Sequence, residues 1–115
     1  MERERERPLV WVGSSKKDLM ALPTPVRKFF GHALHFAQVW ERHDAAKVLK
    51  GFGSAGVLEV VEDNSDGTYR AVYSIRLEEA VFVLHCFQKK SQKTSSEDVA
   101  IATRRYKDLI RELKP

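Results

Sequence analysis

Two β-prone runs separated by a short acidic turn limit the fold of this chain more than any other feature. Val, Ile, Tyr and Phe dominate residues 69–77 and 80–87, as in strands that are partly or fully buried, and Glu78 and Glu79 lie between the two runs. Apolar and polar residues alternate in the first run, which predicts a strand with one buried face. The second run is apolar on both faces as far as Leu84, so we expect a strand inside a sheet.

A tight turn connects the first of these runs to an earlier strand. The segment 63–67, Asp-Asn-Ser-Asp-Gly, is a hairpin signal because Asp-Gly accepts a positive φ, and it predicts antiparallel pairing of residues 57–62 with 69–77. Residues 51–56 match the pattern G-x-G-x-x-G of dinucleotide-binding loops. That pattern requires a helix to follow, whereas a β-prone run follows here, so we interpret the glycines as a turn and expect no cofactor.

The remaining segments supply one more strand and three helices. Residues 9–12 are short and β-prone, while residues 15–22 and 24–40 repeat apolar side chains at helical spacing. A last helix, capped by Thr94 or Ser95, shows the same spacing. The order β-α-α-β-β-β-α predicts an α+β domain with a small, mostly antiparallel sheet, a helical hairpin and a C-terminal helix, with the helices on one face.

Composition adds further limits. The chain has 115 residues, 43% of them hydrophobic, which suits a single domain. We expect this domain to span residues 9–115 and to follow a charged, frayed lead-in at residues 1–8. No apolar run approaches the roughly 20 residues that span a bilayer, and the charged N-terminus lacks the apolar segment of a signal peptide. We therefore expect a cytoplasmic protein without a membrane partner. The single cysteine, Cys86, excludes an internal disulfide, and the net charge of +4 permits an anionic partner.

Five cationic side chains could converge on neighbouring strands: Arg70, Arg76, Lys89, Lys90 and Lys93. Arginine and lysine together bind phosphates, and a lysine crowded by other cations can act as a base near neutral pH because its pKa is lowered. Such a patch suits RNA cleavage by the 2′-hydroxyl, which needs a base, a cation for the phosphorane and an acid for the leaving oxygen. The alternative is a solvated sheet edge, where lysines prevent aggregation.

The histidines give one candidate for acid–base chemistry and no metal site. His85 lies on the same strand as the cationic cluster, although its apolar neighbours also suit a satisfied core histidine. His32 and His35 are about one helical turn apart, and His43 follows them. No cysteine or carboxylate completes a tetrahedral ligand set, so we expect no metal.

Residues 68–94, followed by a helix that ends with residues 102–113, resemble the phage-related, HigB-like branch of the RelE/ParE superfamily. The most specific parts are Thr68-Tyr69-Arg70 and the run 84–91, Leu-His-Cys-Phe-Gln-Lys-Lys-Ser. Members of this superfamily are the toxins of type II toxin–antitoxin pairs. The resemblance implies a small sheet with a basic concave face and an mRNA endonuclease that depends on the ribosome and uses no metal.

The resemblance also implies roles for particular residues. Arg70 matches the arginine that binds the scissile phosphate in the family. Because Arg70 lies on the more polar face of its predicted strand, we expect its removal to leave the fold nearly intact. Lys89 and Lys90 match the basic pair at the end of the last strand, with Lys90 favoured for direct action and Lys93 for steering phosphates. The expected catalytic set is Arg70, Lys89, Lys90 and His85, and the expected RNA-binding set is Arg76, Gln88, Gln92 and Lys93.

Two departures from the family pattern bear on the catalytic assignment. Relatives in other branches often carry basic residues on the strand before the hairpin, where residues 57–61 are interrupted only by Glu59. The C-terminal tyrosine or histidine catalyst of several relatives has no unambiguous counterpart in this chain.

Three functions remain open from the sequence. The first is mRNA cleavage on the ribosome, the second a ParE-like inhibitor that binds a protein target, and the third a decayed phage module that only binds nucleic acid or an antitoxin. For the first, we expect a helix-turn-helix antitoxin and mRNA on the ribosome as partners, with operator DNA bound only through the antitoxin.

Overall fold

A computed structural model of the chain describes residues 5–52, 56–89 and 95–113. Its elements, in chain order, are β1 (Leu9–Trp11), α1 (Ser15–Met20), α2 (Thr24–Gln38), β2 (Ala46–Val48), β3 (Val57–Asn64), β4 (Gly67–Ser74), β5 (Val81–Lys89) and α3 (Ser96–Leu113). These elements confirm the predicted α+β class and the predicted order of helices, with one additional strand, β2. Across the described ranges, no helix is long and apolar enough to cross a membrane.

The strands form one open sheet in the order β1-β5-β4-β3-β2, in which only β1 and β5 run parallel. The predicted hairpin is confirmed, since Asn64 pairs with Gly67 and the whole of β3 pairs antiparallel with β4. β5 lies inside the sheet, as predicted, and its first seven residues are all buried. β2 has only three residues on the sheet edge, too few for an alternating pattern to be recognised in the sequence.

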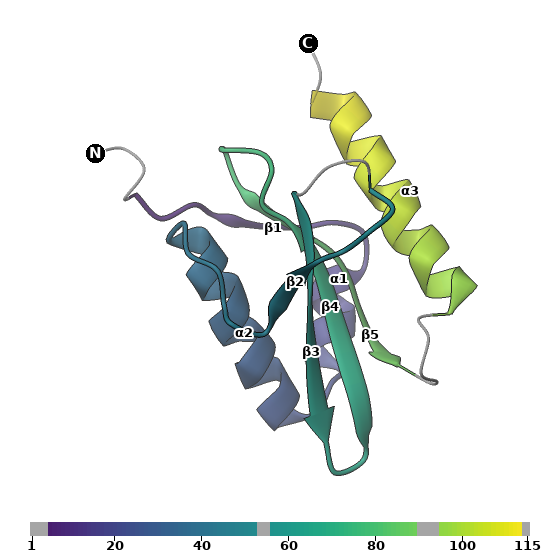
Figure 1. Ribbon diagram of the computed structural model, residues 1–115. Coiled ribbons are helices and arrows are strands. Elements are labelled where there is room, and N and C mark those ends of the chain that lie inside the picture. Colours follow the sequence, from purple (N-terminus) through teal and green to yellow (C-terminus); the bar gives the residue numbers. More distant parts are fainter. Residues whose placement is uncertain (1–4, 53–55, 90–94, 114–115) are drawn as a thin grey trace.

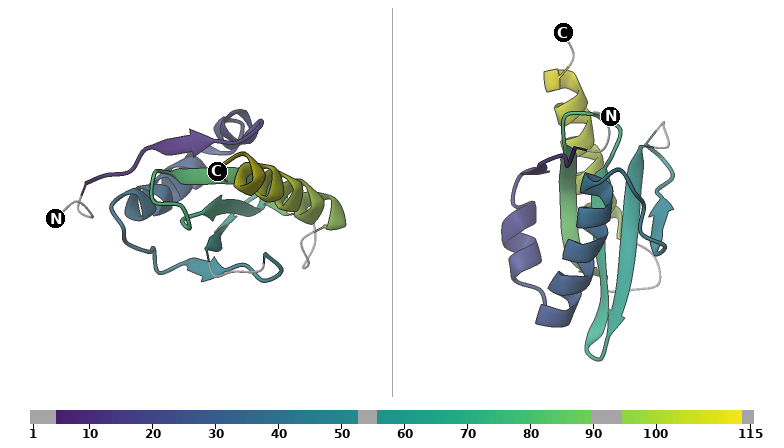
Figure 2. Two further views of the ribbon diagram at one scale, coloured as in Figure 1. Left: turned by 90° about the horizontal axis from the view of Figure 1, so that it is seen from above. Right: turned by 90° about the vertical axis from the view of Figure 1, so that its left-hand side faces the viewer.

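The helices cover both faces of the sheet, so the expectation that they share one face is wrong (Figures 1 and 2). The helices α1 and α2 pack against one face, over Val81 and Val83 of β5. The helix α3 packs against the other face, over Phe82, Leu84 and Phe87. The apolar character of both faces of β5 is explained by this arrangement, because each face of an internal strand lies beneath a helix. We call the side beneath α3 the α3 face.

A β-bulge in β5 sets which of its later residues point to the α3 face. Val72 of β4 pairs with His85 whereas Tyr73 pairs with Val83, so Leu84 has no partner across the strands. Leu84 packs in the α3 cluster, and the adjacent His85 also bonds to a side chain of α3. From His85 onward, the odd-numbered residues of β5 therefore lie on the α3 face, as Phe87 does.

The lead-in predicted to be frayed is anchored in its second half. Arg7 is only 5% exposed, and its guanidinium donates hydrogen bonds to the carbonyl oxygens of Ala37 (2.8 Å) and Leu77 (3.0 Å). The same guanidinium lies 3.8 Å from the ring centroid of Trp40. Arg7 is thus part of the folded domain, while residues 1–4 lie outside the described ranges.

Candidate active site on the α3 face

Two of the predicted cationic residues, Arg70 and Lys89, share the α3 face of the sheet. Arg70 pairs across the strands with Phe87, and Lys89 pairs with Thr68. Because side chains alternate along a strand, Lys89 lies on the same side as Phe87 and diagonally beside Arg70. Three other predicted residues, Lys90, Gln92 and Lys93, lie outside the described residues.

Arg76 is not part of this group. It follows Arg70 by six residues, past the end of β4, which separates the two Cα atoms by up to about 20 Å. Its guanidinium donates a 2.9 Å hydrogen bond to the hydroxyl of Tyr106 on α3. Arg76 therefore connects the sheet to the second half of α3 rather than joining Arg70 and Lys89.

Gln88 lies on the opposite face of the sheet from Arg70, where it pairs with Tyr69. Its side-chain amide donates a 3.4 Å hydrogen bond to the carbonyl of Asp66 in the hairpin turn. A Cβ atom at Gly67, where φ is +151°, would come within 2.5 Å of the same amide nitrogen. The amide of Gln88 therefore packs closely against the turn, and the glycine leaves space for it.

Arg70 is held by the carboxylate of Glu59, which is not among the predicted site residues. Its Nη1 atom lies 2.7 Å from Oε2 of Glu59 on β3, and the two side chains are only 12% and 15% exposed. This ion pair argues against the expectation that Arg70 can be removed with little effect on the fold, because its removal would leave the Glu59 carboxylate half-buried without this partner. The only sequence signal for Glu59 was that it is the single charged residue in the run 57–61.

The register places Glu59 and Lys89 on opposite sides of Arg70. Glu59 pairs with Val72, two residues after Arg70 on β4, whereas Lys89 pairs with Thr68, two residues before it. All three side chains lie on the α3 face, so they form a diagonal across β3, β4 and β5 with the guanidinium between a carboxylate and an ammonium group. We call these three residues the Glu59–Arg70–Lys89 diagonal.

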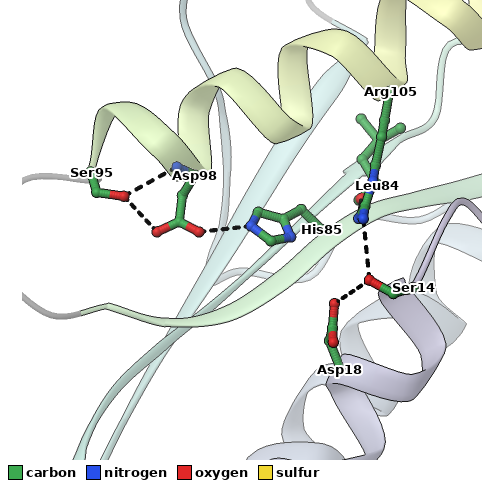
Figure 3. Close-up of polar contacts among 7 residues, drawn as sticks. All are labelled: Ser14, Asp18, Leu84, His85, Ser95, Asp98 and Arg105. Atoms are coloured by element: carbon green, nitrogen blue, oxygen red, sulfur yellow. Dashed lines mark hydrogen bonds and ion pairs between the residues drawn. The ribbon is translucent and has the colours of Figure 1, made fainter.

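His85 lies beside the diagonal and is paired with α3 (Figure 3). Its Nε2 atom is 2.8 Å from Oδ1 of Asp98, and its ring stacks on Phe87 with centroids 4.6 Å apart. Ser95 fixes the carboxylate in turn, since its hydroxyl donates to Oδ2 of Asp98 (2.7 Å) and accepts from the Asp98 backbone N–H (3.1 Å). His85 is thus both nearly buried, at 6% exposure, and part of a carboxylate–imidazole pair.

A small cavity of about 90 Å³ lies beside Glu59, Arg70 and Asp98. Its polar lining comes from Lys50, Glu59, Arg70 and Asp98, and its apolar lining from Leu49, Phe52, Val72, Phe87, Val99 and Ala102. Charges that face an apolar wall are screened less than charges in open water, so a bound phosphate would be held more strongly by Arg70 there. In the sequence, Asp98 is recognisable only as an acidic residue in the first turn of a helix.

The arrangement can supply the parts that phosphodiester cleavage needs without a metal. A guanidinium can bind the phosphate in a forked geometry, a neighbouring carboxylate can accept a proton, and an ammonium group can donate one. In the part of the chain that the structure describes, no three His, Cys, Asp or Glu side chains are grouped so that they could hold a metal ion.

Comparison with known proteins gives a family and a fold. The model of the family described as phage derived protein Gp49-like matches residues 17–107. Among solved structures, a mutant of the E. coli toxin RelE in the free state superimposes with a TM-score of 0.60 at 23% sequence identity, covering 83% of this chain and 96% of that chain. No curated protein matches the chain significantly. The structural match confirms the predicted fold, and the family match covers most of the domain that forms the site.

Proposed function

The chain belongs to the phage-derived Gp49-like family and has a RelE-like fold. We propose that it is a RelE/ParE-type toxin of a type II toxin–antitoxin pair and that it cleaves mRNA on the ribosome. It would act in the cytoplasm, where its substrate is translated. Assignment to the HigB-like branch rests on the motifs at 68–70 and 84–91.

The observation that carries this proposal is the Glu59–Arg70–Lys89 diagonal. An in-line displacement at phosphorus requires the base and the acid on opposite sides of the phosphate. With the scissile phosphate on Arg70, Glu59 and Lys89 lie on opposite sides of it, because they pair with β4 residues on either side of Arg70. A purely structural ion pair would not need the ammonium group of Lys89 on the same face.

In this mechanism the phosphate displaces the Glu59 carboxylate from Arg70. Glu59 then accepts the proton of the 2′-hydroxyl, the 2′ oxygen attacks phosphorus, and the bond from phosphorus to the 5′ oxygen breaks. Lys89 donates a proton to the leaving 5′ oxygen, so one proton is taken up and one is released. Arg70 stabilises the charge on the phosphorane, a contribution that in other enzymes typically amounts to a factor of about 10²–10³ in rate.

His85 contributes indirectly in this proposal, because it is 6% exposed and cannot contact RNA as it stands. Its imidazole holds Asp98 at the cavity wall and supports the ring of Phe87, which also lines the cavity. Lys90 remains a proposed catalytic residue and Lys93 a proposed residue for steering phosphates, and both lie outside the described residues.

The test is cleavage of a defined mRNA by the purified protein, with and without translating ribosomes, mapped by primer extension. We expect cuts only when ribosomes are present. Intact messages together with DNA damage in expressing cells would favour a ParE-like inhibitor of a protein target. Intact messages, continued translation and undamaged DNA would favour a module that only binds nucleic acid or an antitoxin.

In a growing cell, the proposed partner is an antitoxin with a helix-turn-helix domain, which would link this protein to operator DNA. A cationic face favours binding of an acidic or amphipathic segment that covers it. Co-expression with the product of a neighbouring small reading frame should give one peak in size-exclusion chromatography. Separate elution of the two proteins at micromolar concentration would contradict the partnership.

A further inference from the structure

Arg105 of α3 bonds to the β-bulge that determines the orientation of His85 and Lys89 on β5 (Figure 3). Its Nη1 atom donates a 2.7 Å hydrogen bond to the carbonyl oxygen of Leu84, the residue without a partner in the pairing of β4 with β5. A bulge interrupts the regular ladder and leaves backbone groups to be satisfied elsewhere. The Arg105 guanidinium satisfies this one, at the peptide that joins Leu84 to His85.

The helix α3 holds His85 at two points. Asp98 and Arg105 are seven residues apart, which places them on the same side of the helix about 10 Å apart along its axis. Asp98 binds the imidazole of His85, and Arg105 binds the carbonyl oxygen of the preceding residue. The ring and the backbone of one strand residue are therefore fixed by the same helix.

The other end of the Arg105 guanidinium is held by the segment that begins α1. Its Nη2 atom donates to the hydroxyl of Ser14 (3.2 Å), which donates to Oδ2 of Asp18 (2.7 Å). Gly13 has φ of +59°, and a Cβ atom there would lie 2.8 Å from the guanidinium carbon. Gly13 thus leaves space for Arg105, and Ser14 orients it over the bulge.

The bulge determines on which face of the sheet each later side chain of β5 lies. Without the extra residue, the second half of the strand would shift by one position, and each side chain would move to the other face of the sheet. Lys89 would then leave the Glu59–Arg70–Lys89 diagonal. We propose that Arg105 is a positioning residue for RNA cleavage, which keeps the bulge at Leu84 and thereby holds Lys89 and the His85–Asp98 pair on the α3 face.

This inference rests on the proposed function for its effect on cleavage, but its structural part can be measured separately. Arg105→Ala should lower the single-turnover cleavage rate by about 10- to 100-fold, the range for lost positioning of catalytic groups. Arg105→Lys should be intermediate, because an ammonium group cannot span both Leu84 and Ser14 in the forked geometry of a guanidinium. Arg104→Ala is the matched control, since it removes the same charge from the exposed side of the same helix.

Two NMR readouts distinguish positioning from a general loss of stability. In the wild type, the Asp98 carboxylate should keep a proton on Nε2 of His85, which gives a defined ¹⁵N signature of the imidazole. Backbone cross-strand contacts should join Thr68 to Lys89. In Arg105→Ala, the two ¹⁵N signals of the His85 imidazole should move toward a common averaged value, and the backbone contact between Thr68 and Lys89 should weaken. In Arg104→Ala, the imidazole signals and the contact should be unchanged.

Three results would overturn the proposal. Arg105→Ala could cleave at the wild-type rate, it could lose cleavage with both NMR readouts unchanged, or Arg104→Ala could lose as much activity as Arg105→Ala. Should the wild type itself not cleave RNA, the proposed function fails. The NMR comparison of the variants at positions 104 and 105 would then still decide whether Arg105 fixes the bulge.

Discussion

The pair of Arg70 and Glu59 makes a quantitative prediction about stability that is separate from catalysis. Breaking a fully buried ion pair by removing one partner costs about 3–5 kcal/mol. The side chains of Arg70 and Glu59 are 12% and 15% exposed, so solvent partly screens their charges. This screening lowers the expected cost of Arg70→Ala to about 2–3 kcal/mol. A domain of this length loses about 4 °C of Tm per kcal/mol, which gives a decrease of about 10 °C.

The assay is a double-mutant cycle of Arg70→Ala, Glu59→Ala and the double variant, followed by thermal and urea unfolding. Each single variant leaves one charge without this partner, whereas the double variant leaves neither. The double variant should therefore cost less than the sum of the single variants, by about 2 kcal/mol. A melting temperature for Arg70→Ala within about 2 °C of the wild type, or strictly additive costs, would refute the pairing as a stabilising contact.

Three further predictions follow from buried or charged groups. Arg7→Ala should lower the free energy of unfolding by about 2–3 kcal/mol, because it removes hydrogen bonds of a charged group at a buried site. The control is Arg5→Ala on an exposed side chain, which should lower it by less than about 0.5 kcal/mol in the same urea titration. Burial raises the pKa of Cys86 from 9.0 to about 12 and that of Tyr73 from 10.0 to about 12. The folded state binds the proton of each group more tightly than the unfolded state does, so the contribution of these two groups to stability should be constant below pH 9 and should be lost as the pH rises from 9 to 12. A flat urea midpoint from pH 9 to 12 would contradict this. Association with single-stranded RNA should weaken with salt with a log–log slope of about −2, for three phosphate contacts at about −0.7 each, and filter binding that gives a flat dependence would exclude a phosphate site.

The sequence predicts the parts of this fold that depend on local pattern. The alternation in residues 69–77, the uninterrupted apolar run of β5 and the Asp-Gly turn each carry their own signal, and all three elements are present. The prediction of one buried face for β4 is wrong, since Ala71 and Tyr73 pack beneath α1 and α2 while Val72 packs beneath α3. The face on which α3 packs carries no such signal, because a strand that is apolar on both sides accepts a helix on either. β2 is missed for a different reason, since three edge residues show no period.

The site is less predictable because its residues meet only through the register. Arg70 and Lys89 are recognisable as cations near strand ends, but which lysine faces Arg70 depends on a bulge at Leu84 that no residue pattern announces. Glu59 and Asp98 gain their role only when β3 and α3 are placed over β4 and β5. Carboxylates are common on the surfaces of proteins, so their type alone does not identify them.

In the proposed mechanism, the Glu59–Arg70–Lys89 diagonal cleaves RNA through the 2′-hydroxyl. The most direct measurement is single-turnover cleavage on programmed ribosomes of an mRNA with either a ribose or a 2′-deoxyribose at the cut nucleotide. Wild-type protein should cut only the ribose message and leave a 2′,3′-cyclic phosphate. Glu59→Gln, which keeps the shape of the side chain, should slow this step by about 10²–10⁴-fold. Lys28→Ala should not slow it, because Lys28 is exposed on α2, on the opposite side of the sheet. Cleavage of the deoxy message, a product with a 5′-phosphate, or an unchanged rate in Glu59→Gln would contradict the mechanism.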